Sequence, residues 1–105
     1  MQNTIWNPTI DEMKLILAQK FEDEECCFTQ EDITIEEQDN GLKIIIKDFE
    51  HCPISISKEK DDYFGYVLYV KDECEEEIIG MYNSRRDYPY TEALINIGYY
   101  IASRF

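Results

Sequence analysis

Cysteine and histidine are the residues of this sequence best suited to bind a metal ion. Cys26 and Cys27 are adjacent, His51 and Cys52 are adjacent, and Cys74 stands apart. Structural zinc sites usually pair ligands two to four residues apart, so that one turn presents both. Adjacent residues of an extended chain instead point to opposite sides. We therefore predict no metal and no cofactor, and we interpret these thiols as buried and inert. The sequence leaves open whether the five residues do more.

Nucleophilic catalysis would need a base beside a nucleophile, and the sequence supplies one histidine, His51. Its neighbour Cys52 is no evidence for a catalytic dyad, because dyads are assembled by the fold rather than by adjacency in sequence. The obvious acidic pairs fall in expected turns, whereas a catalytic acid needs a partly desolvated setting. The four glycines are too scattered for a phosphate-binding loop. We therefore predict no catalytic residues and no enzymatic activity.

Two acidic runs, residues 22–25 and 72–77, are the sharpest functional feature of the sequence. If they gather on one side of the fold, they would imitate the spaced negative charges of a nucleic-acid backbone and fit the basic groove of a DNA- or RNA-handling protein. The alternative is a solvated acidic rim that keeps a β-rich protein soluble. The order of residues does not show whether the runs converge. The predicted partner-binding residues are Glu22, Asp23, Glu24, Glu25, Asp72, Glu73, Glu75, Glu76 and Glu77.

The overall charge limits the class of partner. The chain carries 23 acidic and 10 basic residues, a formal net charge of -13. This charge argues against direct binding to nucleic acid or to an anionic membrane, and it favours a basic protein partner. No apolar run approaches the roughly 20 residues that span a bilayer. The first residues contain no basic segment of a secretion signal, so we expect a cytoplasmic protein with reduced thiols.

A chain of 105 residues is expected to form a single domain spanning residues 1–105. Residues 8–21 have helical periodicity, with Thr9 and Glu12 as a capping box and Trp6 packing over the first turn. Pro89 suits the first position of a second helix. The core stripe of the first helix is Ile10, Met13, Leu17 and Phe21, and that of the second is Tyr90, Leu94, Ile97, Ile101 and Phe105.

Residues 32–49 read as a β-hairpin folded about Asn40-Gly41, a pair that tolerates positive φ in a two-residue turn. This turn sets Glu37 opposite Ile44 and Ile35 opposite Ile46. It also gathers the apolar residues on one face: Ile33, Ile35, Leu42, Ile44 and Ile46.

Shorter strands follow the hairpin. Residues 54–57, 63–71 and 78–83 alternate as strands, with polar turns at 58–62 and 72–77. Segment 26–28 fits either a short strand or a loop, and Gly65 suggests a bulge. The predicted fold is therefore α+β, with an N-terminal helix, a four- to five-stranded antiparallel meander and a C-terminal helix, the helices covering one face of the sheet.

A second apolar strip on the last helix consists of Ile95, Tyr99 and Ala102. It predicts either a homodimer or a helix sandwiched between the sheet and the first helix. The basic pair Arg85-Arg86 is expected either to hold an acidic patch by ion pairs or to contact a partner, and we favour the ion pairs.

The leading hypothesis is a non-enzymatic protein that binds and neutralises a basic nucleic-acid-acting protein. Two settings fit: an anti-defence inhibitor of a phage or mobile element that mimics nucleic acid, or an immunity protein of a nuclease toxin. The alternative is a dimeric accessory or chaperone-like module that holds a partner segment in an apolar groove.

Overall fold

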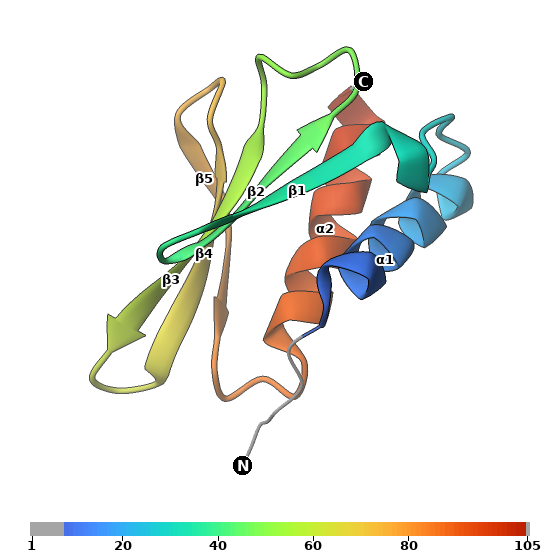
Figure 1. Cartoon of the computed structure of the whole chain (residues 1–105). Helices are drawn as coiled ribbons and strands as arrows, with labels where there is room; N and C mark the ends of the chain where they lie inside the picture. Colours follow the sequence, from blue (N-terminus) through green and yellow to red (C-terminus); the bar gives the residue numbers. More distant parts are fainter. Residues whose placement is uncertain (1–7, 105) are drawn as a thin grey trace.

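The computed structural model describes residues 8–104, so the predictions for Trp6 and Phe105 lie outside the described residues. Its order of elements is the one that the sequence predicted, with five strands between two helices (Figure 1). In chain order the elements are α1 (Ile10–Asp23), the 3₁₀ turn η1 (Gln30–Asp32), β1 (Ile33–Gln38), β2 (Gly41–Ile46), β3 (Ile54–Asp61), β4 (Gly65–Asp72), β5 (Glu77–Asn83) and α2 (Pro89–Arg104).

The five strands form one open antiparallel sheet in the order β1-β2-β3-β4-β5. Both helices lie on one face of this sheet, as Figure 1 shows. They pack against each other, α1 beside β1 and α2 over β4 and β5. The predicted α+β fold is therefore confirmed, and the core is the layer between the helices and the sheet.

The hairpin has the predicted faces but a different register. Glu37 pairs with Leu42 and Ile35 with Ile44, two residues away from the predicted pairing. A shift of two residues keeps every side chain on its face, so the five apolar residues of the hairpin are buried as expected. The predicted Asn40-Gly41 turn is wrong, because Gly41 already belongs to β2 and the loop is residues 39–40.

Gly41 explains the register. A Cβ at this position would lie 1.7 Å from the backbone oxygen of Ile56 on β3. Within residues 8–104, no positive φ occurs at residues 39–41. The glycine therefore serves the close approach of β3, not a left-handed turn.

The ends of α1 follow local rules of the sequence. At the N-terminus the Thr9 N–H donates to Glu12 Oε1 at 2.8 Å and the Glu12 N–H donates to Thr9 Oγ1 at 3.2 Å, the predicted capping box. At the C-terminus the Cys26 N–H donates to the Phe21 carbonyl at 2.7 Å and the Glu25 N–H to that of Glu22 at 3.0 Å. This pair of bonds closes the helix as a Schellman motif.

Strand β3 is longer than predicted. Lys58 was expected to begin a turn, but it pairs with Leu68, and the β3–β4 turn is residues 62–64. The Lys58 ammonium lies 4.5 Å from the ring centre of Tyr66, so this polar residue of β3 contacts an aromatic neighbour on β4. The register irregularity lies at Val70/Lys71, so the bulge predicted at Gly65 is wrong.

The second helix buries the predicted stripe, from Tyr90 to Ile101, against the sheet and α1. Its second strip is only partly covered, because Ile95 and Tyr99 remain 41% and 54% exposed. Within residues 8–104, neither helix has the length and apolar character needed to cross a membrane.

Candidate functional site

Both predicted acidic runs lie at the same end of the molecule. In an antiparallel meander, the end of β2, the start of β3, the end of β4 and the start of β5 share one end of the sheet. The C-terminus of α2 reaches this end, since Arg104 pairs with Glu75 of the β4–β5 turn. The segment after α1 reaches it too, since the rings of Phe28 and Phe49 lie 5.9 Å apart. In Figure 1 the β2–β3 connection and the C-terminus of α2 lie at the top, the β4–β5 turn lies at the upper left and the segment after α1 lies at the upper right.

Acidic residues of η1 and of the β2–β3 connection lie at the same end of the fold as the two runs. We call this set the acidic end and define it by its exposed carboxylates. They are Glu22, Asp23, Glu24, Glu25, Glu31, Asp48, Glu50, Glu75, Glu76 and Glu77.

Asp72 shapes the β4–β5 turn from beneath. Its Oδ1 accepts hydrogen bonds from the backbone N–H groups of Cys74 at 2.9 Å and Glu75 at 3.2 Å, and its Oδ2 accepts one from the Tyr100 hydroxyl. Burial alone would raise the pKa of Asp72, but these bonds and the nearby Arg104 hold it below its usual value. The carboxylate is charged, and 3% exposed. Asp72 was predicted to contact a partner, but the structure buries it beneath the turn, where it holds the backbone of Cys74 and Glu75.

Arg104 ties the last turn of α2 to this carboxylate and to the turn. Its Nη2 donates to Glu75 Oε1 at 3.0 Å, and its Nη1 donates to the Tyr100 hydroxyl at 3.0 Å. Burial and the bond to Asp72 raise the pKa of Tyr100 to about 12. Tyr100 and Arg104 were not predicted as site residues, and their i, i+4 spacing at the end of a helix was the available signal.

Glu73 is also drawn inward. Its Oε2 accepts a hydrogen bond of 2.5 Å from the Ser55 hydroxyl, and the residue is half-buried.

In the first run, Lys20 lies 3.1 Å from Glu24, and Gln19 donates to Asp23 at 3.2 Å. These exposed contacts contribute little stability, about 0–1 kcal/mol for an ion pair.

Three residues of the acidic end adopt a left-handed backbone. They are Glu25 with φ 58°, Asp48 with φ 72° and Glu76 with φ 54°, and they are all the non-glycine residues with positive φ among residues 8–104. The left-handed conformation disfavours an L-residue by roughly 1–2 kcal/mol, and glycine is the usual choice there. The chain thus places carboxylates where glycine would relieve strain.

The basic pair Arg85-Arg86 lies at the opposite end of the sheet, after β5. Arg86 pairs with Glu92 of α2 at 2.7 Å, and Arg85 lies 4.5 Å from the ring centre of Tyr63. The expected ion pairing is therefore found, but with a helix residue. The arginine that forms an ion pair with the acidic β4–β5 turn is Arg104.

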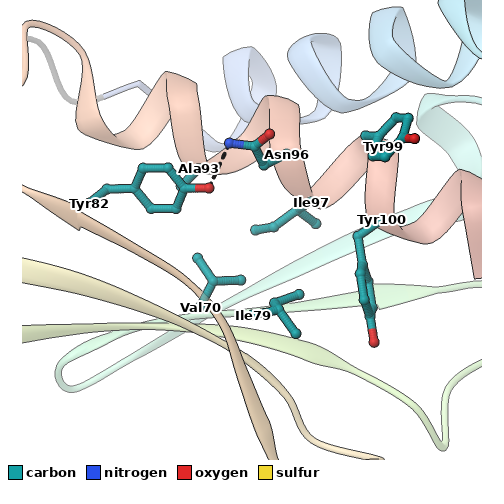
Figure 2. A pocket seen from close by; sticks show the side chains of 8 residues that line it. All are labelled: Val70, Ile79, Tyr82, Ala93, Asn96, Ile97, Tyr99 and Tyr100. Carbon is teal, nitrogen blue, oxygen red and sulfur yellow. Dashed lines mark hydrogen bonds between the residues drawn. The ribbon is translucent and has the colours of Figure 1, made fainter.

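A hollow of about 320 Å³ separates α2 from β4 and β5 (Figure 2). The Asn96 amide donates to the Tyr82 hydroxyl at 2.6 Å across it, and Figure 2 shows Tyr99 and Tyr100 on the same stretch of helix. Its lining residues are Val70, Ile79, Tyr82, Ala93, Asn96, Ile97, Tyr99 and Tyr100. Because its amide and hydroxyl groups bond each other, we assign it no ligand.

The predicted chemistry-bearing residues are separated into two groups. Cys26 and Cys27 follow α1, whereas His51 and Cys52 lie in the β2–β3 connection near Cys74. Cys27, His51 and Cys74 are exposed, which contradicts the expectation of buried thiols for two of the four cysteines. Across residues 8–104, no three Cys, His, Asp or Glu side chains are grouped as metal ligands.

Comparison with protein-family models, with curated proteins and with solved structures returned no match. The acidic end is therefore interpreted from its own charge, burial and backbone geometry.

Proposed function

We propose that this chain is a stoichiometric binding protein that neutralises a basic, nucleic-acid-acting protein through its acidic end. The observation that carries this proposal is the arrangement of exposed carboxylates from four separate segments at one end of the fold. A set of fixed negative charges of this kind attracts a basic groove and raises the rate of encounter.

The backbone of the acidic end also supports binding. Glu25 and Glu76, one in each run, occupy left-handed positions. Residues in sparsely populated backbone conformations persist only where the surrounding structure holds them, and they cluster at functional sites. The turn containing Glu76 is in turn held by Asp72 and Arg104. The charges are thus presented on an ordered frame.

Two settings suit this activity equally. In one, the chain is an anti-defence inhibitor of a phage or mobile element and occupies the nucleic-acid groove of a defence enzyme. In the other, it is an immunity protein that covers a nuclease toxin. Both use acidic side chains against basic substrate-binding residues, and both predict a cytoplasmic protein.

The test compares two double charge reversals. The acidic-end variant Glu22→Lys/Glu77→Lys takes one residue from each run, and the control Glu37→Lys/Asp39→Lys changes the same charge at the opposite end of the sheet. A partner is captured from native lysate at low salt, and both variants are titrated against it. We expect the acidic-end variant to bind about tenfold or more weakly and the control to bind nearly as the wild type does.

Equal weakening by both variants would show that net charge acts without a site. Unchanged affinity of the acidic-end variant would refute the proposal. Binding should also fall at about 0.5 M salt, where exposed charges are screened.

An apolar groove between the helices favours a second candidate, the dimeric accessory module. The groove encloses about 420 Å³ and is lined by Leu15, Ile16, Gln19, Lys20, Asp23, Thr91 and Ile95. Leu15, Ile95 and the adjacent Tyr99 are all more than 40% exposed. If this groove holds a partner segment, Tyr99→Ala should abolish binding and added salt should leave it intact. Light scattering of the free protein distinguishes a dimer from a monomer.

A further inference from the structure

Two cysteines from different connections follow the same end of the β3–β4 ladder, at the acidic end. The β3–β4 pairing sets Ile54 opposite Asp72, and one step outward the Glu73 N–H donates to the Pro53 carbonyl at 3.1 Å. Cys52 lies in the β2–β3 connection and Cys74 in the β4–β5 turn, and continuing the same register by one more step would set them opposite each other. Hydrogen-bonded and non-hydrogen-bonded pairs alternate along an antiparallel ladder, so this pair follows as the closer, non-hydrogen-bonded type.

This position suits a disulfide. Directly opposed residues of an antiparallel pair have Cα atoms about 4.5–5.5 Å apart, and disulfides span about 4.4–6.8 Å between Cα atoms. A hydrogen bond with Cys74, together with burial, raises the pKa of the Cys52 thiol to about 11, which agrees with neighbouring positions for the two side chains. Both cysteines are free thiols in the structure.

The other cysteines are placed differently. Cys26 and Cys27 are consecutive residues after α1, and Cys26 packs against the core. Neither lies next to the end of the β3–β4 ladder, so they serve as internal references for thiol reactivity.

We infer that Cys52 and Cys74 form a reversible dithiol–disulfide site that exchanges with small disulfides. The site lies beside the proposed binding surface, but its chemistry is independent of any partner and goes beyond the proposed function.

The exchange balances in two steps. The exposed Cys74, as thiolate, attacks one sulfur of a low-molecular-weight disulfide, forms a mixed disulfide and expels one small thiolate. Cys52, on losing its proton, attacks the Cys74 sulfur, which forms the Cys52–Cys74 bond and expels the second thiolate. The two cysteines together lose two protons and two electrons, and the small disulfide gains them as two thiols.

The bond would join the β2–β3 connection to the β4–β5 turn. In the reduced protein the turn is held by the side chains of Asp72 and Arg104 and by the Glu73 backbone bond. The disulfide adds a covalent tie at Cys74, between the exposed Glu75–Glu77 and the sheet. Oxidation therefore restricts the motion of the second acidic run, and a reducing compartment leaves it free.

Peptide mapping tests the inference on the full chain. The reduced protein is equilibrated with oxidised and reduced glutathione, alkylated, and digested with trypsin, which places Cys52 in peptide 48–58, Cys74 in peptide 72–85 and the other two cysteines in peptide 21–43. We expect peptides 48–58 and 72–85 to be linked, in the wild type and in Cys26→Ser/Cys27→Ser. At the same glutathione ratio, the linked fraction should fall about tenfold or more in urea.

Two outcomes would overturn the inference. One is a glutathione adduct on Cys74 with no linked peptide in Cys26→Ser/Cys27→Ser. The other is a linked fraction as large in urea as in the folded protein, because the fold would then provide no proximity. Neither outcome depends on partner binding, so failure here is distinct from failure of the proposed function. Hydrogen exchange at residues 73–77 provides a second readout, and it should slow on oxidation.

Discussion

Among single residues, Asp72 and Tyr100 decide the shape of the second acidic run. The carboxylate is charged and buried, and it is satisfied by two backbone N–H groups and by the Tyr100 hydroxyl. A buried charge is tolerated only when bonded in this way. The exposed carboxylates of the turn therefore depend on a hidden one, and a mutation beneath the turn should affect the charges above it.

Tyr100→Phe removes one hydrogen bond to the Asp72 carboxylate while keeping the ring. We expect the free energy of unfolding at pH 8 to fall by about 1–2 kcal/mol, because a bond to a charged acceptor is lost. The matched control Tyr99→Phe, one residue earlier and 54% exposed, should change stability little. Urea unfolding of both variants measures the difference.

The same variant should alter the alkaline behaviour. The folded-state pKa of Tyr100 is raised from 10.0 to about 12, so the unfolded chain releases the proton first. The stabilisation is full below pH 10 and is lost as the pH rises toward 12. Tyr100→Phe should show a smaller loss of stability over that window than the wild type. An equal loss in both proteins would contradict the assignment.

Residue types alone indicated the acidic runs, but they did not indicate the buried residues that hold the second run in place. Glu22–Glu25 and Glu75–Glu77 were visible as charge in sequence, whereas the burial of Asp72 depends on α2 arriving from 28 residues away. Cys52 and Cys74 are likewise 22 positions apart, and the β3–β4 register brings their two connections together. Local patterns contain no information on such pairings.

At the scale of elements, the periodicity of apolar residues predicted which strand faces are buried, but it did not predict the register in which the strands pair. The alternation of isoleucines determined which face of β1 and β2 is buried, because either register two residues apart buries the same side chains. The Asn40-Gly41 dipeptide pointed to a hairpin turn, but the glycine is needed by the backbone of β3. Glycine is required at this position by the neighbouring strand β3, and the sequence preferences of turns do not take a neighbouring strand into account.

Gly41→Ala tests that explanation. The added methyl would meet the Ile56 carbonyl, so the strands must separate locally, and we expect a loss of about 1–3 kcal/mol in the free energy of unfolding. Lys43→Ala, two residues along the same strand and on the same face, provides the control and should have a smaller effect. Chemical denaturation compares them. Equal stability of the wild type and Gly41→Ala would mean that β3 does not pack on this position.

The C-terminus of α1 offers an opposite test. Glu25 follows the helix in a left-handed conformation, so Glu25→Gly should stabilise the protein by about 0.5–1 kcal/mol. Glu24→Gly, at φ -93°, removes the same charge and its ion pair with Lys20 without relieving strain, and should not stabilise the protein. Thermal unfolding of the pair separates backbone strain from charge. A gain of equal size in both variants would assign the effect to charge repulsion.

At the scale of the whole molecule, the charges that would favour binding of a basic partner at the acidic end also lower the stability of the fold. Like charges gathered from four segments repel one another in the folded state, and this repulsion weakens as salt is added. The sequence predicted the net charge, but its concentration at one end follows from the antiparallel order of the strands. If the charges serve a partner, the fold retains them against its own stability.

The two charge-reversal variants test this opposition. Glu22→Lys/Glu77→Lys places positive charge among the remaining carboxylates, so it should raise the free energy of unfolding at low salt, by about 0.5 kcal/mol. The same variant should lower the affinity for the captured partner about tenfold. Glu37→Lys/Asp39→Lys changes the net charge equally, away from the acidic end, and should stabilise less. Urea unfolding at low salt and at about 0.5 M salt measures both, and the advantage of the first variant should shrink as the salt screens repulsion. If the acidic-end variant loses both stability and affinity, its lost binding would reflect damage to the fold. Opposite signs in the two measurements would identify the acidic end as a surface maintained for a partner.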